Sequence, residues 1–250
     1  MLRLSLSFLL IVLTVGCSTI SKRDRERALL HMQIGTGYLQ QGQYPLAMSE
    51  LQKAERLDPT NPLILNNLGL SYYVRGKTEV AEKKFREAIR LDTRYSDAKN
   101  NLARMMIETG QAKKALGILG EVEGDLTYQF PEKTLSNYGM AYFNLGQYKK
   151  AEEYLLRARQ LRRENCVTAN FYGRTLLAQK RMAESAEALD QAIEYCRDIH
   201  FEEPLYFSAM SYYSLGQREK SRARLEELLK DYPKSKYVAK AKGMLELLGE

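Results

Sequence analysis

Small and apolar residues recur along the chain at helical spacing, in pairs of short segments. Between Leu65 and Tyr72 the apolar positions lie three or four residues apart, which places them on one face of a helix. Gly76 interrupts this segment, and Ala81 and Phe85 resume the same spacing in a second one. One such pair of helices cannot bury its apolar face alone, so the pattern predicts stacked copies.

Copies of this pattern follow one another along the chain. The turn residue recurs every 34 or 36 positions, with one copy in which a lysine replaces glycine: Gly42, Gly76, Gly110, Gly146, Lys180 and Gly216. We therefore expect six units and a C-terminal capping helix, at residues 28–61, 62–95, 96–131, 132–165, 166–201, 202–235 and 236–250.

The period, the small residue followed by an aromatic in the first helix, and the Ala–bulky–Ala triplet of the second helix resemble the tetratricopeptide repeat. The resemblance covers nearly all of residues 28–235. It implies an all-α fold: a right-handed superhelical solenoid of about six helix hairpins with a C-terminal cap, forming one domain over 28–250. Lys180 and the weakly matching third unit are departures from the repeat.

The N-terminus has the pattern of a secretory signal. Arg3 supplies a positive charge, and the apolar run 4–15 follows it. This run is too short for a membrane-spanning helix, which takes about 20 residues.

Gly16 and Cys17 end this run, and a small residue directly before a cysteine resembles the lipobox of bacterial lipoproteins. The resemblance implies that residues 1–16 are a lipoprotein signal peptide and that Cys17 is acylated. Several acyl chains would anchor the protein firmly, because one chain alone binds only marginally. Thr14 stands where leucine is usual, and an ordinary signal peptide with an incidental cysteine is the alternative.

Residues 17–27 are expected to form the lipid anchor and a polar tether. Ser18 follows the cysteine, whereas lipoproteins kept in the inner membrane carry aspartate at this position. The resemblance therefore implies an outer-membrane protein that faces the periplasm.

Two further cysteines occur, Cys166 and Cys196. The first opens unit five and the second lies near its end, so an antiparallel hairpin places them side by side. A secreted protein occupies a compartment that permits disulfides. We expect a disulfide here, and two buried free thiols are the alternative.

The composition argues against several functions. The formal charge is +7, but the basic residues are spread over helix surfaces and form no stripe with interleaved base-stacking groups. The only histidines are His31 and His200, and no His/Cys cluster has the spacing of a zinc site. We therefore expect no nucleic-acid binding, metal, cofactor, small-molecule substrate or enzymatic activity.

In the tetratricopeptide repeat the first helices line a concave surface, and the resemblance assigns partner contacts to specific positions of each unit. These positions form an apolar, aromatic and methionine-containing lining that suits an amphipathic or extended peptide. Packing between adjacent helices is the alternative for each side chain. The positions are Met32, Thr36, Leu39, Asn66, Leu70, Tyr73, Asn100, Arg104, Ile107, Met140, Phe143, Asn170 and Arg174.

A short insertion at 125–132 leads into Asn137-Tyr138-Gly139 between the third and fourth units. This insertion, the opening 34–39, the number of units and the lipobox resemble the PilW/PilF lipoproteins of type IV pilus biogenesis. The resemblance implies a pilotin-like protein that helps an outer-membrane secretin to reach the membrane and to multimerise. The alternative is another envelope scaffold, in outer-membrane protein assembly or peptidoglycan synthesis.

Overall fold

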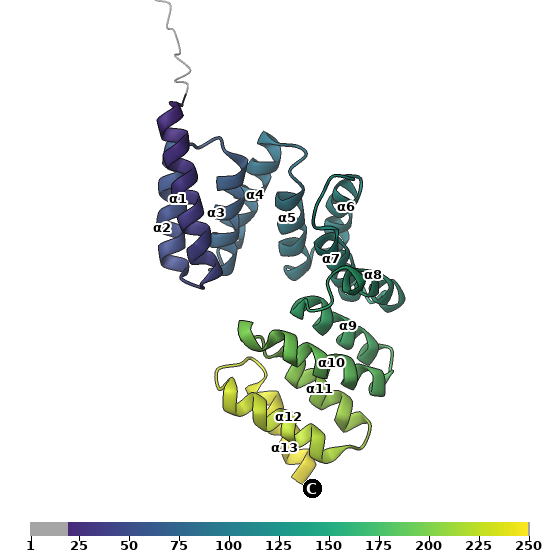
Figure 1. Cartoon of the computed structure of the whole chain (residues 1–250). Coiled ribbons are helices and arrows are strands. Elements are labelled where there is room, and N and C mark those ends of the chain that lie inside the picture. Colours follow the sequence, from purple (N-terminus) through teal and green to yellow (C-terminus); the bar gives the residue numbers. More distant parts are fainter. Residues whose placement is uncertain (1–19, 250) are drawn as a thin grey trace, which may run out of the picture.

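The protein is described from a computed structural model, which covers residues 20–249. The expected signal peptide and the acylation of Cys17 lie outside the described residues. Within them all regular secondary structure is helical, with thirteen α-helices, one short 3-10 helix and no strand. No helix in this range is long and apolar enough to cross a membrane. The expected all-α solenoid is confirmed (Figure 1).

The helices alternate between the first and the second helix of each unit. The first helices are α1 (Lys22–Gln40), α3 (Pro62–Val74), α5 (Ser96–Glu108), α7 (Pro131–Asn144), α9 (Cys166–Ala178) and α11 (Glu203–Ser214). The second helices are α2 (Tyr44–Leu57), α4 (Thr78–Leu91), α6 (Ala112–Glu123), α8 (Tyr148–Leu161), α10 (Met182–Cys196) and α12 (Arg218–Asp231). The 3-10 helix η1 (Arg197–Ile199) follows α10, and α13 (Val238–Gly249) ends the stack.

The first helix begins earlier than the sequence pattern indicates. α1 starts at Lys22, so the second half of the expected tether at 17–27 is helical. Ser21 caps the helix, because its hydroxyl accepts a hydrogen bond from the Asp24 amide, and Asp24 places a negative charge in the first turn. A tether was predicted because residues 22–27 are highly charged, and Ser21 was not recognised as a helix N-cap.

Within each hairpin the two helices approach closely at the small residue of the first helix. A Cβ atom added at Gly69 would lie 2.5 Å from the ring of Phe85, and one at Gly139 would lie 2.4 Å from Leu155. Both large side chains are fully buried. The repeated small residue is therefore required by the packing of the hairpin itself.

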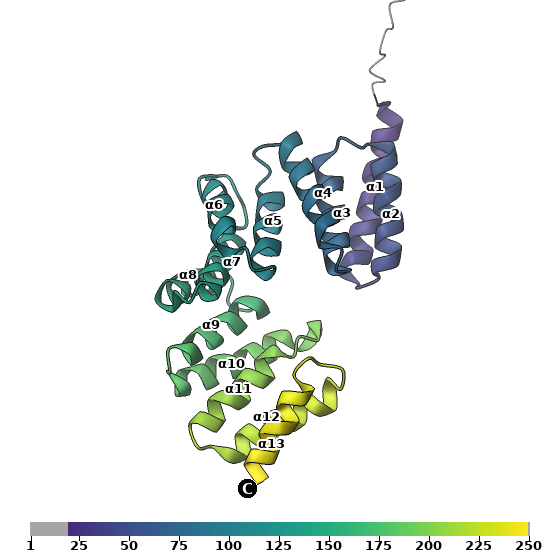
Figure 2. The ribbon, with the colours of Figure 1, turned by 180° about the vertical axis from the view of Figure 1, so that it is seen from behind.

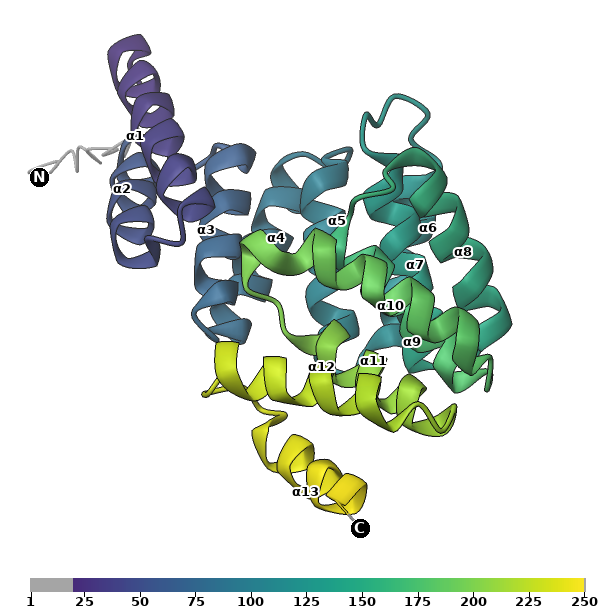
Figure 3. The ribbon, with the colours of Figure 1, turned by 60° about the horizontal axis from the view of Figure 1, so that its bottom comes forward.

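The stack curves as it grows. Each first helix lies close to the first helix of the next unit, whereas successive second helices in the described part of the chain meet only through side chains, such as the Lys84–Glu55 and Arg224–Asp190 ion pairs. The first helices therefore line the inner side of the curve and the second helices fan apart on the outer side. Seen from behind, the helices follow one another in the same order (Figure 2). In Figure 3 the stack runs from α1 across to α8 and turns back through α9 towards α13.

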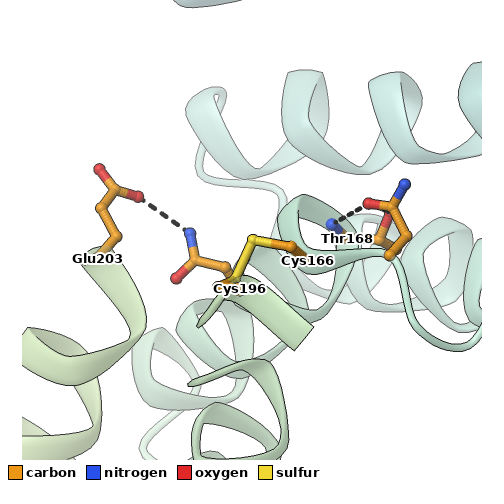
Figure 4. The surroundings of a disulfide bond; sticks show 6 residues. Cys166, Thr168, Cys196 and Glu203 are labelled. Carbon is orange, nitrogen blue, oxygen red and sulfur yellow. Dashed lines mark hydrogen bonds between the residues drawn. A yellow bond between two sulfur atoms is a disulfide. The ribbon is translucent and has the colours of Figure 1, made fainter. Parts of the chain in front are cut away.

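The expected disulfide is confirmed. Cys166, at the start of α9, is bonded to Cys196, at the end of α10, with their Cα atoms 4.9 Å apart. Both cysteines are buried. Figure 4 shows the bond joining the two helix ends, with Glu203 of the next unit on the neighbouring helix. The bond therefore closes the open end of hairpin five beside its junction with unit six.

Candidate functional site

The candidate site is the inner groove, the surface formed by the first helices of the six units. Its position follows from the contacts between successive first helices, which bring one face of each to the inside of the curve. Eight of the expected groove residues keep part of their side chains accessible there: Met32, Thr36, Leu39, Leu70, Tyr73, Arg104, Phe143 and Arg174.

Five other expected groove residues are buried between helices and are not available to a partner: Asn66, Asn100, Ile107, Met140 and Asn170. Three of these are asparagines that link successive units. The Asn101 side-chain amide donates to Asn66 Oδ1 over 2.8 Å, and Asn137 donates to Asn100 Oδ1 over 3.2 Å. Buried amides require such partners, because an unpaired one is costly to desolvate.

The remaining two buried positions are apolar. Ile107 is 0% exposed and Met140 is 1% exposed, and both belong to the core that joins units two, three and four. Their side chains point into the packing between helices, which is the alternative that the sequence left open. Fewer side chains are therefore accessible in the groove than the thirteen expected from the sequence.

In the N-terminal half of the groove, one carboxylate links two units. The hydroxyl of Tyr73 on α3 donates to Glu108 on α5, and the guanidinium of Arg104 on α5 pairs with the same carboxylate. Burial raises the pKa of Tyr73, and the neighbouring negative charge of Glu108 adds to the effect. The phenol is therefore held neutral, with its ring half-buried beside Leu70.

The C-terminal half of the groove is built around Arg174. Its guanidinium lies 4.9 Å from the ring centroid of Phe143, 4.7 Å from that of Phe171 and 4.5 Å from that of Phe207. Cation–π contacts of this kind strengthen where water is partly removed, so the three rings help to hold the guanidinium in place. Together the rings bring aromatic surface from three successive units to one place.

Glu203 on α11 holds this arginine in place. Its side chain is 10% exposed, and its carboxylate pairs with Arg174 Nη1 at 2.9 Å and accepts hydrogen bonds from Asn170, Lys236 and Tyr237. Burial raises the pKa of Glu203, but the charges of Arg174 and Lys236 and the donated hydrogen bonds outweigh it. The net effect holds the pKa below the usual range. The carboxylate is thus a charged junction between units five and six and the C-terminal segment.

Sequence reasoning missed Phe171, Phe207 and Glu203. One signal for the two rings was present. The position two residues before the small residue of each first helix is Asn in units two, three and four, and changes to Phe171 and Phe207 in units five and six. In units two to four the asparagines form hydrogen bonds between units, and in units five and six the phenylalanines place aromatic rings there instead. No pattern marked Glu203, because its partners come from two other segments of the chain, α9 and residues 236–237.

The groove offers apolar and aromatic side chains with two paired arginines, an arrangement suited to holding a peptide segment. No group of three or more His, Cys, Asp or Glu residues within the described range is placed to hold a metal ion.

Family models for the tetratricopeptide repeat match four stretches of the chain. The TPR repeat model matches residues 35–76, and tetratricopeptide-repeat models match residues 66–123, 132–165 and 205–235. No curated protein matches the chain in sequence.

Three solved structures have a similar fold. PilW, described as a widely conserved type IV pilus biogenesis factor, has a TM-score of 0.72 at 17% identity, over 85% of this chain and 97% of its own. The pilF protein of Pseudomonas aeruginosa has a TM-score of 0.70 at 20% identity, over 89% and 100%. The Cut9–Hcn1 complex of the APC/C gives 0.80 at 18% identity, over 90% of this chain and 43% of that one. At these identities the likeness concerns the fold, and together with the repeat models it identifies the chain as a tetratricopeptide-repeat protein.

Proposed function

We propose that the protein is an outer-membrane lipoprotein scaffold with a pilotin-like role: it binds a secretin subunit in its inner groove and promotes secretin localisation, secretin multimerisation and type IV pilus biogenesis. The observation that carries this proposal is the extent of the likeness to PilW and pilF, which covers 97% and 100% of those chains. The lipobox-like sequence at Cys17 supplies the anchor.

The anchor determines which part of the groove meets the membrane. Cys17 precedes the start of α1 by five residues, and an extended chain spans at most about 3.5 Å per residue. Units one and two therefore stay near the membrane surface, where a secretin inserts. We place the principal contact on Leu70 and Tyr73, the accessible groove side chains of unit two.

The test is the double variant Leu70→Ala/Tyr73→Ala. Truncating two half-buried groove side chains is expected to weaken secretin binding by about 1–4 kcal/mol. Secretin multimers and surface pili are expected to fall together in cells. Tyr73→Phe separates the ring from its hydroxyl, because it removes only the bond to Glu108. The matched control is Lys83→Ala on α4, which is exposed and lies outside the groove.

Binding measured with purified proteins and secretin assembly measured in cells must agree. If a strain lacking the protein assembles secretin and pili normally, the pilotin role is wrong. In that case the alternative function, a scaffold in outer-membrane protein assembly or peptidoglycan synthesis, is favoured.

The anchor has a separate test. Cys17→Ser is expected to abolish labelling with palmitate and to release the protein from the outer-membrane fraction. A variant that is still labelled and still sediments with the outer membrane contradicts acylation at this residue.

A further inference from the structure

The outer face of the solenoid contains clefts that follow from its curvature. Because the second helices fan apart, a space opens between one second helix and the next. Such clefts lie between α4 and α6, between α6 and α8, and between α10 and α12, with volumes of about 310, 360 and 530 Å³. The first two are lined by the N-terminal end of the next first helix, whereas the third is lined by the C-terminal end of α11 and the start of α12.

Two of the three clefts have one more acidic than basic residue in their linings. The cleft between α6 and α8 is lined by Glu123 and Asp125 against Arg157. In the cleft between α10 and α12 three acidic residues face Lys220 and Arg224, and the latter is bonded to Asp190 at 3.0 Å. Neither lining has the excess of basic residues that would attract an acidic ligand.

The cleft between α4 and α6 differs from these two. Its charged lining consists of Arg86, Arg90 and Lys99 against the single acid Glu121. Arg86 is paired with Glu82 along α4, and the described residues offer Arg90 no ion-pair partner. The floor is apolar and consists of Ile89, Leu102 and Ile118.

Lys99 is the unusual member of this basic cleft. Its side chain is only 10% exposed, although a buried ammonium is costly to remove from water. It pairs at 2.7 Å with Glu121, whose own side chain is 62% exposed. When Glu121 leaves the pair its mostly exposed carboxylate regains hydration, so the cost falls on the buried ammonium unless another anion replaces the carboxylate. The buried cation can therefore accept another carboxylate in its place.

We propose that the basic cleft between α4 and α6 is a second interaction site, which binds an acidic peptide segment of another protein. A carboxylate of that segment pairs with Lys99 and Arg90 while Glu121 turns to solvent. A neighbouring apolar side chain lies on Ile89 and Ile118. The basic residues of the cleft select acidic ligands, and its apolar floor selects ligands that also carry an apolar side chain. An acidic peptide segment meets both conditions.

This site lies on the opposite side of the solenoid from the inner groove. It does not depend on the secretin proposal, and its test uses neither the groove nor secretin.

The test uses the soluble chain without its lipid and two fluorescent peptides, GDFELG and its amide counterpart GNFQLG. We expect the acidic peptide to bind about tenfold more tightly than the amide peptide, because only the acidic peptide forms an ion pair in the cleft. The advantage should shrink when salt rises from about 0.05 to about 0.5 M.

The variant Arg90→Met/Lys99→Met should abolish the preference for the acidic peptide. It is expected to fold, because Glu121, the partner left behind by Lys99→Met, is 62% exposed and stays hydrated, so no unpaired charge is buried. The control Arg75→Met/Lys83→Met removes two exposed positive charges outside the cleft and should keep the preference. Equal binding of the two peptides, or an equal loss in the control, overturns the proposal.

Displacement of the peptide by inorganic phosphate alone indicates a simple anion site, and binding of anionic vesicles in place of peptide indicates a lipid surface; both outcomes also overturn it.

Discussion

Units two and five form the same hairpin by different means. In unit two the turn residue is Gly76 and the small residue of the second helix is Ala81, so both positions carry the residues that the repeat prefers. In unit five these positions are Lys180, with a φ of 62°, and Ser185, which is 0% exposed. The Ser185 hydroxyl lies 2.9 Å from the carbonyl oxygen of Gly173 and donates to it.

The departures in unit five are accompanied by contacts that unit two lacks. The disulfide closes its open end, and the Arg174–Glu203 pair joins it to unit six. A lysine in the left-handed conformation costs stability, and the buried Ser185 hydroxyl needs its hydrogen bond to Gly173 to offset the loss of water. The comparison therefore shows that a repeat can lose its preferred residues where covalent and polar contacts compensate.

The largest expected effect is the loss of the disulfide. The variant Cys166→Ala/Cys196→Ala opens a loop of 30 residues, which is worth about 3–4 kcal/mol in the chain-entropy model. Denaturant unfolding should show the loss, and hydrogen exchange should place it in units five and six while units one and two keep their protection. The same midpoint for the oxidised and the reduced protein contradicts this account of unit five.

Removing the charged junction should cost nearly as much. Glu203→Gln leaves Arg174 without its carboxylate, and we expect a loss of about 3 kcal/mol, the low end for breaking a buried pair. The effect should depend on pH. Because the folded-state pKa of Glu203 is lowered, its contribution is complete above the usual glutamate pKa and is lost as the pH falls through the folded value.

Measured unfolding free energies between about pH 6 and 3 should therefore decline less steeply in Glu203→Gln than in the parent protein. Parallel pH profiles for the two proteins would show that Glu203 does not carry this charge-dependent stability. Glu226→Gln, an exposed change on α12, is the matched control.

A smaller effect is expected in the regular unit. Ala81→Leu adds volume where Ala81 is 0% exposed and packs in the same core as Phe85, at a cost of about 1–3 kcal/mol. Val80→Leu on the same helix is the control, since Val80 is 39% exposed. A melting curve unchanged by Ala81→Leu would contradict the assigned packing of α3 on α4.

Much of the architecture follows from the sequence because the determinants of the repeat are local. Turn glycines, small residues at close approaches and helical spacing are visible in one unit and reinforced by its copies. Even Lys180 was placed correctly, because the spacing demanded a turn residue there and the structure has it at positive φ. The start of α1 was missed because its cap at Ser21 lies outside the repeated pattern.

The groove was less predictable, because accessibility depends on how neighbouring units meet. Asn66 and Asn100 occupy positions that face a ligand in the repeat, yet here they bond to the next first helix. Position within one unit therefore identifies a helix face but not whether the next helix covers it. Glu203 illustrates the same limit, since only the folded chain brings Arg174 and Lys236 to it.

The smallest expected effect exchanges the turn residues of the two units. Lys180→Gly should stabilise the protein by about 0.5–1 kcal/mol. Glycine avoids the roughly 1–2 kcal/mol cost of the left-handed conformation but gains freedom in the unfolded chain. Gly76→Lys should destabilise it by a similar amount, and no clash contributes, because a Cβ atom there meets nothing within 4 Å. The control Lys77→Gly changes an exposed lysine at a φ of −89° and should only lower stability slightly.

If Lys180→Gly raises the unfolding free energy and Gly76→Lys lowers it in matched denaturation curves, the cost lies in the backbone conformation of the turn. A loss in both variants would mean that the Lys180 side chain itself stabilises unit five.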